Sequence, residues 1–150
     1  MRTDTGKTFR LEDYKPTDYA VKTVNLVFRL DPERTVVTAT TVFLRRETTA
    51  AGAALILDGD GLSLLSLKVD GRKMTSDAYE ASADQLVIQN PPAETVFSIE
   101  IETEINPSTN RALMGRYRSG NIYCTQCEAE GFRRITYFPD RPDILAVYSV

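Results

Sequence analysis

Histidine is absent from all 150 residues of this chain. Its absence excludes Ser-His-Asp and Cys-His arrangements and removes the nitrogen ligand that zinc sites use most often. A hydrolase confined to these residues would have to work with carboxylates, lysine or thiols alone. The composition therefore argues against hydrolytic chemistry carried out by this chain by itself.

Other features are scarce too. Cysteine occurs only twice, which is too few for a disulfide scaffold. No apolar run approaches the roughly 20 residues of a membrane helix. The N-terminal segment 1–19 is polar and partly acidic, unlike a signal or transit peptide. These features predict a cytoplasmic, reducing location and no membrane partner.

The charge balance gives no support for nucleic-acid binding. The net charge is −3 and no long basic run occurs, so the electrostatic signal of a nucleic-acid partner is missing. The basic end of the chain is residues 106–150, with six arginines against four acids. A length of 150 residues with 42% hydrophobic content fits one globular domain with a real core.

Period-two alternation dominates the first two thirds of the chain. In 19–30, apolar Val24, Leu26 and Phe28 alternate with polar positions, which predicts a half-buried strand. A turn at 31–34 and the β-branched run 35–45 predict an antiparallel hairpin. Further short apolar runs occupy 53–57, 62–70, 85–90 and 95–105, with a tight-hairpin signal at Asp70-Gly71. This texture predicts an all-β fold, an antiparallel β-sandwich.

The texture changes after Ile105. Residues 106–121 read as a polar loop with room for one helical turn around 112–114. The stretches NIYCT and FRRITYF look like two further strands, on either side of CEAEG. The chain ends on the apolar run DILAVYSV. Two interpretations are open: a final strand docked in the sheet, or a chain cut from a longer protein within an element, which we favour.

The stretch 123–143, YCTQCEAEGFRRITYFPDRPD, is dense in chemically capable groups. A zinc knuckle would need two more ligands besides Cys124 and Cys127, and a thioredoxin-like pair would need a long helix after the second cysteine. Neither context is present. We therefore expect buried or half-buried thiols without a redox role, and a redox or metal role remains the alternative.

Acceptor groups follow the cysteines. If the stretch is extended, Gln126, Glu128 and Glu130 project to one side and suit a cationic partner such as an ammonium group. The alternative is a solvated acidic edge, or pairing of the two glutamates with Arg133 and Arg134. The segment 140–143, Asp-Arg-Pro-Asp, reads as a turn with an aspartate as its cap.

The same stretch resembles the N-terminal domain of bacterial aminopeptidase N, in the zinc-dependent gluzincin family. There, a Q-x-E-x-x-x-x-R element precedes an aromatic stretch and a D-R-P-D turn. The matching positions here are Gln126, Glu128, Arg133, Phe138, Asp140, Arg141, Pro142 and Asp143. The family's lead-in N-x-x-L-x-G-x-Y-x-S-G is matched at Asn110, Leu113, Gly115, Tyr117, Ser119 and Gly120, and residues 14–46 resemble its opening hairpin.

The resemblance implies that residues 1–150 are an N-terminal β domain resting on a thermolysin-like catalytic domain of the same chain. Residues 106–143 would carry the element that binds the substrate's N-terminus. Gln126 and Glu128 would receive the free α-amino group of a peptide, which limits cleavage to its first residue. The implied function is that of a zinc metallo-aminopeptidase domain, and a self-sufficient β-sandwich binding module is the alternative.

The sequence also departs from the family pattern. The family's zinc ligands in H-E-x-x-H, its G-x-M-E-N segment and its transition-state tyrosine have no counterpart here. We therefore expect no catalytic residues and no cofactor in this chain, with zinc held by the full-length parent. Residues 1–150 alone are expected to be inactive and to bind no zinc specifically.

Overall fold

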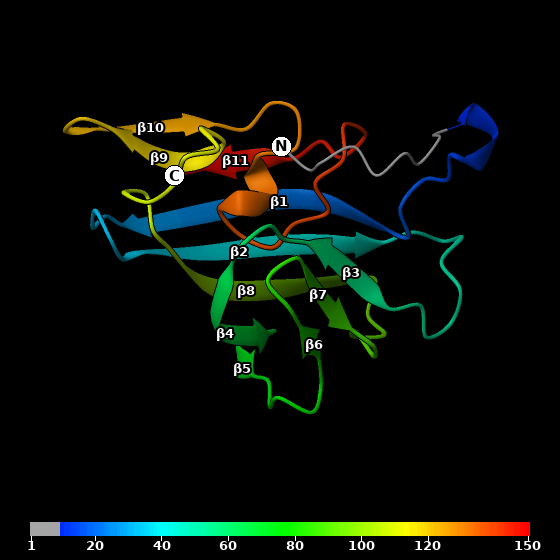
Figure 1. Cartoon of the computed structure of the whole chain (residues 1–150). Coiled ribbons are helices and arrows are strands. Elements are labelled where there is room, and N and C mark those ends of the chain that lie inside the picture. Colours follow the sequence, from blue (N-terminus) through cyan, green and yellow to red (C-terminus); the bar gives the residue numbers. More distant parts are fainter. Residues whose placement is uncertain (1–9) are drawn as a thin grey trace.

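The computed structural model describes residues 10–150, and these residues form three β-sheets and two short 3-10 helices (Figure 1). The elements in chain order are η1 (Leu11–Asp13), β1 (Tyr19–Arg29), β2 (Thr35–Arg45), β3 (Leu55–Asp58), β4 (Ser63–Val69), β5 (Arg72–Lys73), β6 (Glu80–Ala81), β7 (Gln85–Ile88), β8 (Val96–Ile105), β9 (Gly115–Ser119), β10 (Ile122–Gln126), η2 (Phe132–Arg134) and β11 (Val147–Ser149). The prediction of an all-β fold is confirmed. The prediction that segment 1–19 is not a signal or transit peptide falls partly on residues 1–9, which lie outside the described residues.

The sheets contain six, three and two strands within the described part of the chain. Their strand orders are β11-β1-β2-β8-β4-β5, β3-β7-β6 and β10-β9. Pairing is antiparallel except between β11 and β1, which run parallel. No helix formed by residues 10–150 is long and apolar enough to cross a membrane.

The predicted hairpin of β1 and β2 is confirmed, with one irregularity that alternation alone did not predict. The register shifts between Val21 and Thr23, so one extra residue enters β1. Because of this bulge, both Val21 and Val24 face the core although they are three positions apart. At the turn, the Asp31 carboxylate accepts the backbone N–H groups of Glu33 and Arg34 at 2.9 and 2.8 Å, which lowers the pKa of Asp31.

Strand β8 confirms the expected separation of a dry face from a wet face. Its odd positions from Phe97 to Ile105 are buried, while Glu100, Glu102 and Glu104 point outward. Each of these glutamates pairs with a basic side chain of a neighbouring strand or turn: Lys68, Arg29 and Arg34. The hairpin signal at Asp70-Gly71 is also confirmed, since both residues have positive φ and join β4 to β5.

The core lies between the six-stranded sheet and the three-stranded sheet. The large sheet contributes fully buried Phe43, Leu67 and Ile99, and the small sheet contributes Leu57 and Leu86. The rings of Phe43 and Phe97 stack with centroids 5.7 Å apart. Two packed β layers around one apolar core match the predicted sandwich.

Three local predictions for residues 106–138 are wrong. Residues 115–119 form strand β9, which pairs with β10, and no helical turn forms at 112–114. The stretch FRRITYF contains the helical turn η2, whose backbone bonds are local (Ile135 N–H to Phe132 O, 2.9 Å), and only a single bridge joins Phe138 to Asp58. Residues 135–140 are all buried, whereas a strand on one sheet buries alternate positions.

The last apolar run forms a short strand, as one interpretation predicted. β11 lies beside β1, and the Tyr148 ring packs edge-on against Phe132 at 5.8 Å. Leu145, Val147 and Val150 are exposed.

Candidate functional site

The acceptor-rich loop is a tight turn. The N–H of Gly131 donates to the carbonyl of Cys127 at 2.8 Å, residues 128–131 form the turn, and the Glu128–Ala129 peptide bond is cis. The interpretation of an extended stretch with Gln126, Glu128 and Glu130 on one side is therefore wrong. A side chain on Gly131 would lie 2.6 Å from the Gln126 carbonyl oxygen, so this close packing requires glycine.

Both residues predicted to bind the substrate are exposed and lie at this turn. Gln126 is the last residue of β10, and its side-chain oxygen accepts the backbone N–H of Glu128 at 3.3 Å. The Glu128 carboxylate has no hydrogen bond or ion pair with any side chain of residues 10–150. The alternative, in which the glutamates pair with arginines, holds for Glu130 only, whose Oε1 lies 3.4 Å from Nη2 of Arg133.

Glu128 lines a cavity of about 600 Å³. The cavity wall combines acidic, basic and small apolar side chains from four separate parts of the chain: Gly59, Asp60, Asp84, Ala112, Met114, Glu128, Ala129, Glu130, Arg133 and Arg134. Gln126 lies beside this cavity and is not part of its wall. Four carboxylates face two guanidiniums, so the wall has an excess of negative charge and favours cations.

Both arginines of the wall are already neutralised. The Arg134 Nη1 donates to the Asp60 carboxylate at 2.6 Å. The Arg133 Nε donates to Asp140 at 3.1 Å, and its Nη2 reaches Glu130. Within the described residues this pairing leaves Glu128 and Asp84 as the wall carboxylates without an ionic partner.

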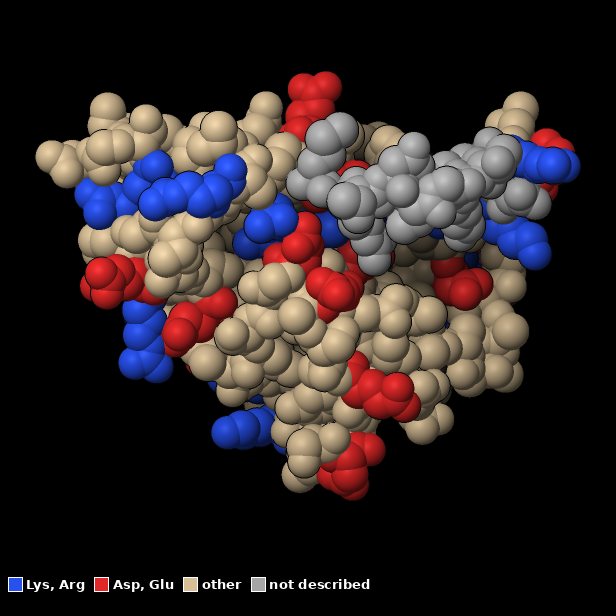
Figure 2. Space-filling view, in the orientation of Figure 1, with Lys and Arg blue, Asp and Glu red and all other residues tan. Residues whose placement is uncertain are grey.

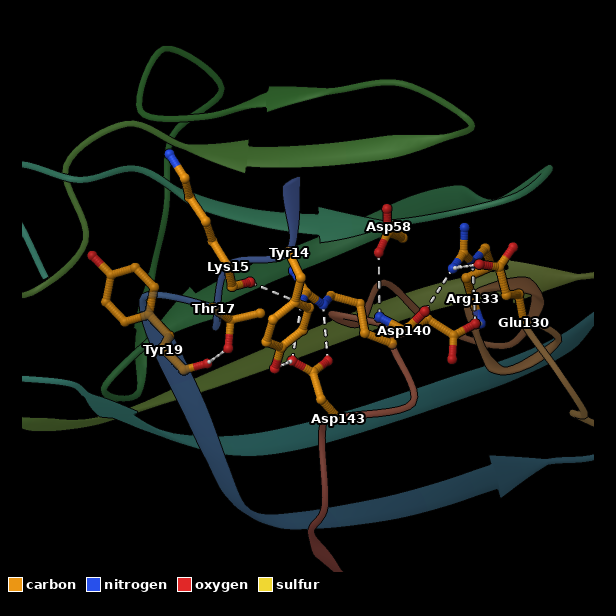
Figure 3. Close-up of polar contacts among 10 residues, drawn as sticks. Tyr14, Lys15, Thr17, Tyr19, Asp58, Glu130, Arg133, Asp140 and Asp143 are labelled. Atoms are coloured by element: carbon orange, nitrogen blue, oxygen red, sulfur yellow. Dashed lines mark hydrogen bonds and ion pairs between the residues drawn. The ribbon is translucent and has the colours of Figure 1, made fainter. Parts of the chain in front are cut away.

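The segment behind the cavity is fixed by polar contacts to the sheets (Figure 3). The N–H of Asp140 donates to the Asp58 carboxylate at 3.3 Å, which ties the turn 140–143 to the end of β3. Asp143 accepts from Arg141 at 2.9 Å and from the Tyr14 hydroxyl at 2.9 Å. The hydrogen bonds from Arg141 lower the pKa of Asp143. A turn forms at 141–144, where the N–H of Ile144 donates to the carbonyl of Arg141 at 3.1 Å. The predicted aspartate cap is not seen among the described residues, since the carboxylates of Asp140 and Asp143 bind Arg133, Arg141 and Tyr14 instead.

The β9–β10 hairpin is held on the large sheet by cation–π contacts. The Arg116 guanidinium lies 5.1 Å from the ring centre of Phe28 in β1 and 5.3 Å from that of Tyr123 in β10. Arg118 lies 5.5 Å from the same tyrosine ring. Figure 2 shows basic side chains gathered on the side of the molecule where this hairpin lies. Two of the arginines in the basic end of the chain, Arg116 and Arg118, therefore hold the β9–β10 hairpin in place through aromatic rings.

The two cysteines are unpaired and half-buried, as expected. Burial, with a smaller contribution from the charge of Asp140, raises the pKa of Cys127. A raised pKa lowers the fraction of reactive thiolate, which disfavours the redox alternative. No group of three or more histidine, cysteine, aspartate and glutamate side chains within residues 10–150 is arranged to hold a metal.

Several wall residues were not predicted from the sequence. Asp60 and Asp84 come from bends far from the 123–143 stretch in the chain, and Met114 precedes β9. The acids of the sequence Asp-Gly-Asp-Gly at 58–61 are a local signal for this part of the wall. In the structure Gly59 packs closely, since a Cβ there would lie 2.7 Å from the ring of Tyr137.

The described residues thus form a β-sandwich domain with an acidic cavity beside a tight loop. The model of the Peptidase M1 N-terminal domain matches residues 15–150, so the chain belongs to that family. The resemblance found in the sequence is thus confirmed.

Full-length relatives carry the same domain. The chain is 49% identical over 150 residues to aminopeptidase N of Caulobacter vibrioides, covering all of this chain and 17% of that protein. The structure of Legionella pneumophila aminopeptidase A in complex with aspartic acid is similar with a TM-score of 0.83 at 34% identity, over 93% of this chain and 16% of that one. The chain thus spans about one sixth of these relatives.

A more distant structure shares the fold. A mutant M1 zinc metallopeptidase from Deinococcus radiodurans, bound to a Tyr-Ser-Ala substrate, is similar with a TM-score of 0.68 at 15% identity, over 87% of this chain and 31% of that one. The name of that protein includes zinc. Residues 10–150 do not provide a zinc site, since they lack a cluster of ligands and the whole sequence lacks histidine.

Proposed function

We propose that this chain is the N-terminal β domain, residues 1–150, of a zinc aminopeptidase that removes the first residue of peptides. In this proposal Glu128 and Gln126 bind the free α-amino group of the substrate. The observation that carries it is the exposed Glu128 carboxylate, which lacks an ionic partner among the described residues on the wall of a cavity with excess negative charge.

The chemistry of the two side chains fits an ammonium group. A carboxylate attracts the positive charge and accepts N–H groups, and such charge-assisted hydrogen bonds are stronger than neutral ones. The Gln126 oxygen accepts one N–H from the Glu128 backbone at 3.3 Å and has a second lone pair for the substrate. An internal peptide bond carries no such charge, so the site selects a peptide's first residue.

The metal and the hydrolytic step belong to the rest of a longer protein in this proposal. Residues 10–150 provide no cluster of zinc ligands, and relatives with zinc or aminopeptidase in their names are several times longer than this chain. The domain would rest on a catalytic domain of the same chain in the cytoplasm, and residues 1–150 alone would show no turnover. These peptidase relatives favour this function over a self-sufficient binding module.

The test is the Glu128→Gln variant of the full-length enzyme. The loss of one charge-assisted contact, about 1.5–3 kcal/mol, should lower kcat/KM for an alanyl p-nitroanilide by about 10- to 150-fold. Glu33→Gln, in the exposed turn between β1 and β2, is the matched control and should change nothing. An unchanged kcat/KM in Glu128→Gln would show that the α-amino group binds elsewhere.

A further inference from the structure

Arg133 lies directly behind the loop and is buried, with a side chain only 8% exposed. Its backbone N–H and its Nε both donate to Oδ2 of Asp140 at 3.1 Å, and its Nη2 donates to the Asp140 carbonyl at 2.6 Å. A buried guanidinium destabilises a fold unless its donors are satisfied. These contacts pair its charge with Asp140 and fix the direction of its Nε and Nη2.

The same guanidinium contacts the loop. Its Nη2 lies 3.4 Å from Oε1 of Glu130, whose side chain is 57% exposed. Glu130 is two positions from Glu128 in the same turn, and both residues line the cavity. Glu130 pairs with Arg133, whereas Glu128 has no ionic partner within residues 10–150.

The guanidinium is in turn tied to the small sheet. Asp140, which holds Arg133, donates its backbone N–H to Asp58 at the end of β3. The carbonyl of Arg133 also accepts the N–H of Asp60 at 3.0 Å. Figure 3 shows the resulting chain of contacts from Asp58 through Asp140 and Arg133 to Glu130. A rigid part of the fold thus reaches the otherwise exposed loop.

We propose that Arg133 is a positioning residue for the α-amino site. It draws Glu130 back against the protein and so fixes the turn that presents Glu128 to the cavity. This inference rests on the proposed function, because it requires Glu128 to bind the substrate. Arg133 acts in this proposal through the turn and not by touching the substrate, since its Nε and Nη2 are directed at Asp140 and Glu130.

The test uses the full-length enzyme with the variants Arg133→Gln, Glu128→Gln and the double variant. Displacement of a binding group by a substitution outside the chemistry costs up to about 100-fold, so we expect Arg133→Gln to raise KM by about 10-fold or more. The value of kcat should stay within about twofold, because binding and not chemistry is disturbed. Arg133→Lys should rescue KM only in part, because one ammonium group cannot reproduce the forked contacts.

The double variant separates positioning from a general structural defect. If Arg133 acts through Glu128, the double variant will have the KM of Glu128→Gln alone, whereas independent effects multiply. Arg141→Gln is the matched control, since Arg141 lies in the next turn and pairs with Asp143 away from the cavity. It should lower the melting temperature and leave KM unchanged.

A second variant covers the case in which Arg133→Gln does not fold. Glu130→Gln removes only the loop side of the contact, and the loss of a largely exposed ion pair should raise KM by about two- to fivefold. The inference is overturned by an unchanged KM in folded Arg133→Gln or in Glu130→Gln, or by multiplying effects in the double variant. An unchanged KM in Glu128→Gln alone would instead overturn the proposed function.

Discussion

Replacing Gly131 by alanine tests whether the loop is held by close packing. The backbone at Gly131 has φ −91° and ψ −14°, a conformation that any residue adopts, so the backbone geometry opposes nothing. An added Cβ would lie 2.6 Å from the Gln126 carbonyl oxygen and 2.8 Å from the Cα of Cys127. Both are backbone atoms that cannot rotate away, so the loop itself must move.

The expected cost follows from that overlap. Overpacking of this kind destabilises by about 1–3 kcal/mol, which outweighs the gain of about 0.4–1 kcal/mol that Gly→Ala gives through the unfolded chain. For 150 residues, each kcal/mol lowers the melting temperature by about 2–4 °C. We therefore expect Gly131→Ala to melt several degrees lower by circular dichroism.

A matched glycine isolates the effect on the loop. Gly120, at the opposite end of the β9–β10 hairpin, has φ 58° and open space around its Cβ position. Gly120→Ala should cost about 1–2 kcal/mol through the left-handed backbone alone, yet leave KM of the full-length enzyme unchanged. Gly131→Ala should raise KM as well. A melting temperature at or above that of the parent chain for Gly131→Ala would refute the packing argument.

Other predictions concern single contacts. Hydrogen bonds from Arg141 lower the pKa of Asp143, so the contribution of this carboxylate to stability is present above about pH 4 and is lost below it. The difference in unfolding free energy between the parent chain and Asp143→Asn should therefore be smaller at pH 3 than at pH 7. An equal difference at both pH values would contradict this expectation. The raised pKa of Cys127 predicts that iodoacetamide at pH 8 modifies it more slowly than a free thiol peptide, and that urea removes the difference. Loss of the cation–π contacts in Arg116→Leu, about 0.5–2 kcal/mol, should speed amide exchange in β9 and β10 while β2 and β8 stay protected.

The long strands were predictable because their information is local. Apolar and polar residues alternate along β8, so period two identifies it directly, and the β-branched run of β2 identifies that strand. The bulge in β1 and the parallel pairing of β11 depend on tertiary contacts that no local pattern contains.

The sequence pointed to Glu128 in the cavity wall, but neither to the other wall carboxylates nor to the geometry of the loop. The choice of Glu128 and Gln126 came from the family resemblance, and their role stays a prediction. Alternation predicts an extended chain at 126–130, whereas close packing at Gly131 and local hydrogen bonds close the turn at 128–131. The aromatic and β-branched residues of FRRITYF favour a strand, yet residues 132–134 form the helical turn η2 and residues 135–138 are all buried.

Contacts made by the segment 134–143 join residues that are far apart in the chain. Arg134 and Asp60 are 74 positions apart, Asp140 and Asp58 are 82, and the Tyr14–Asp143 hydrogen bond spans 129. Closing such long loops is entropically costly and slow. During synthesis the β1–β2 hairpin can form early, whereas the cavity wall can close only once residue 134 has left the ribosome. The pocket should therefore mature later than the β1–β2 hairpin in a nascent chain.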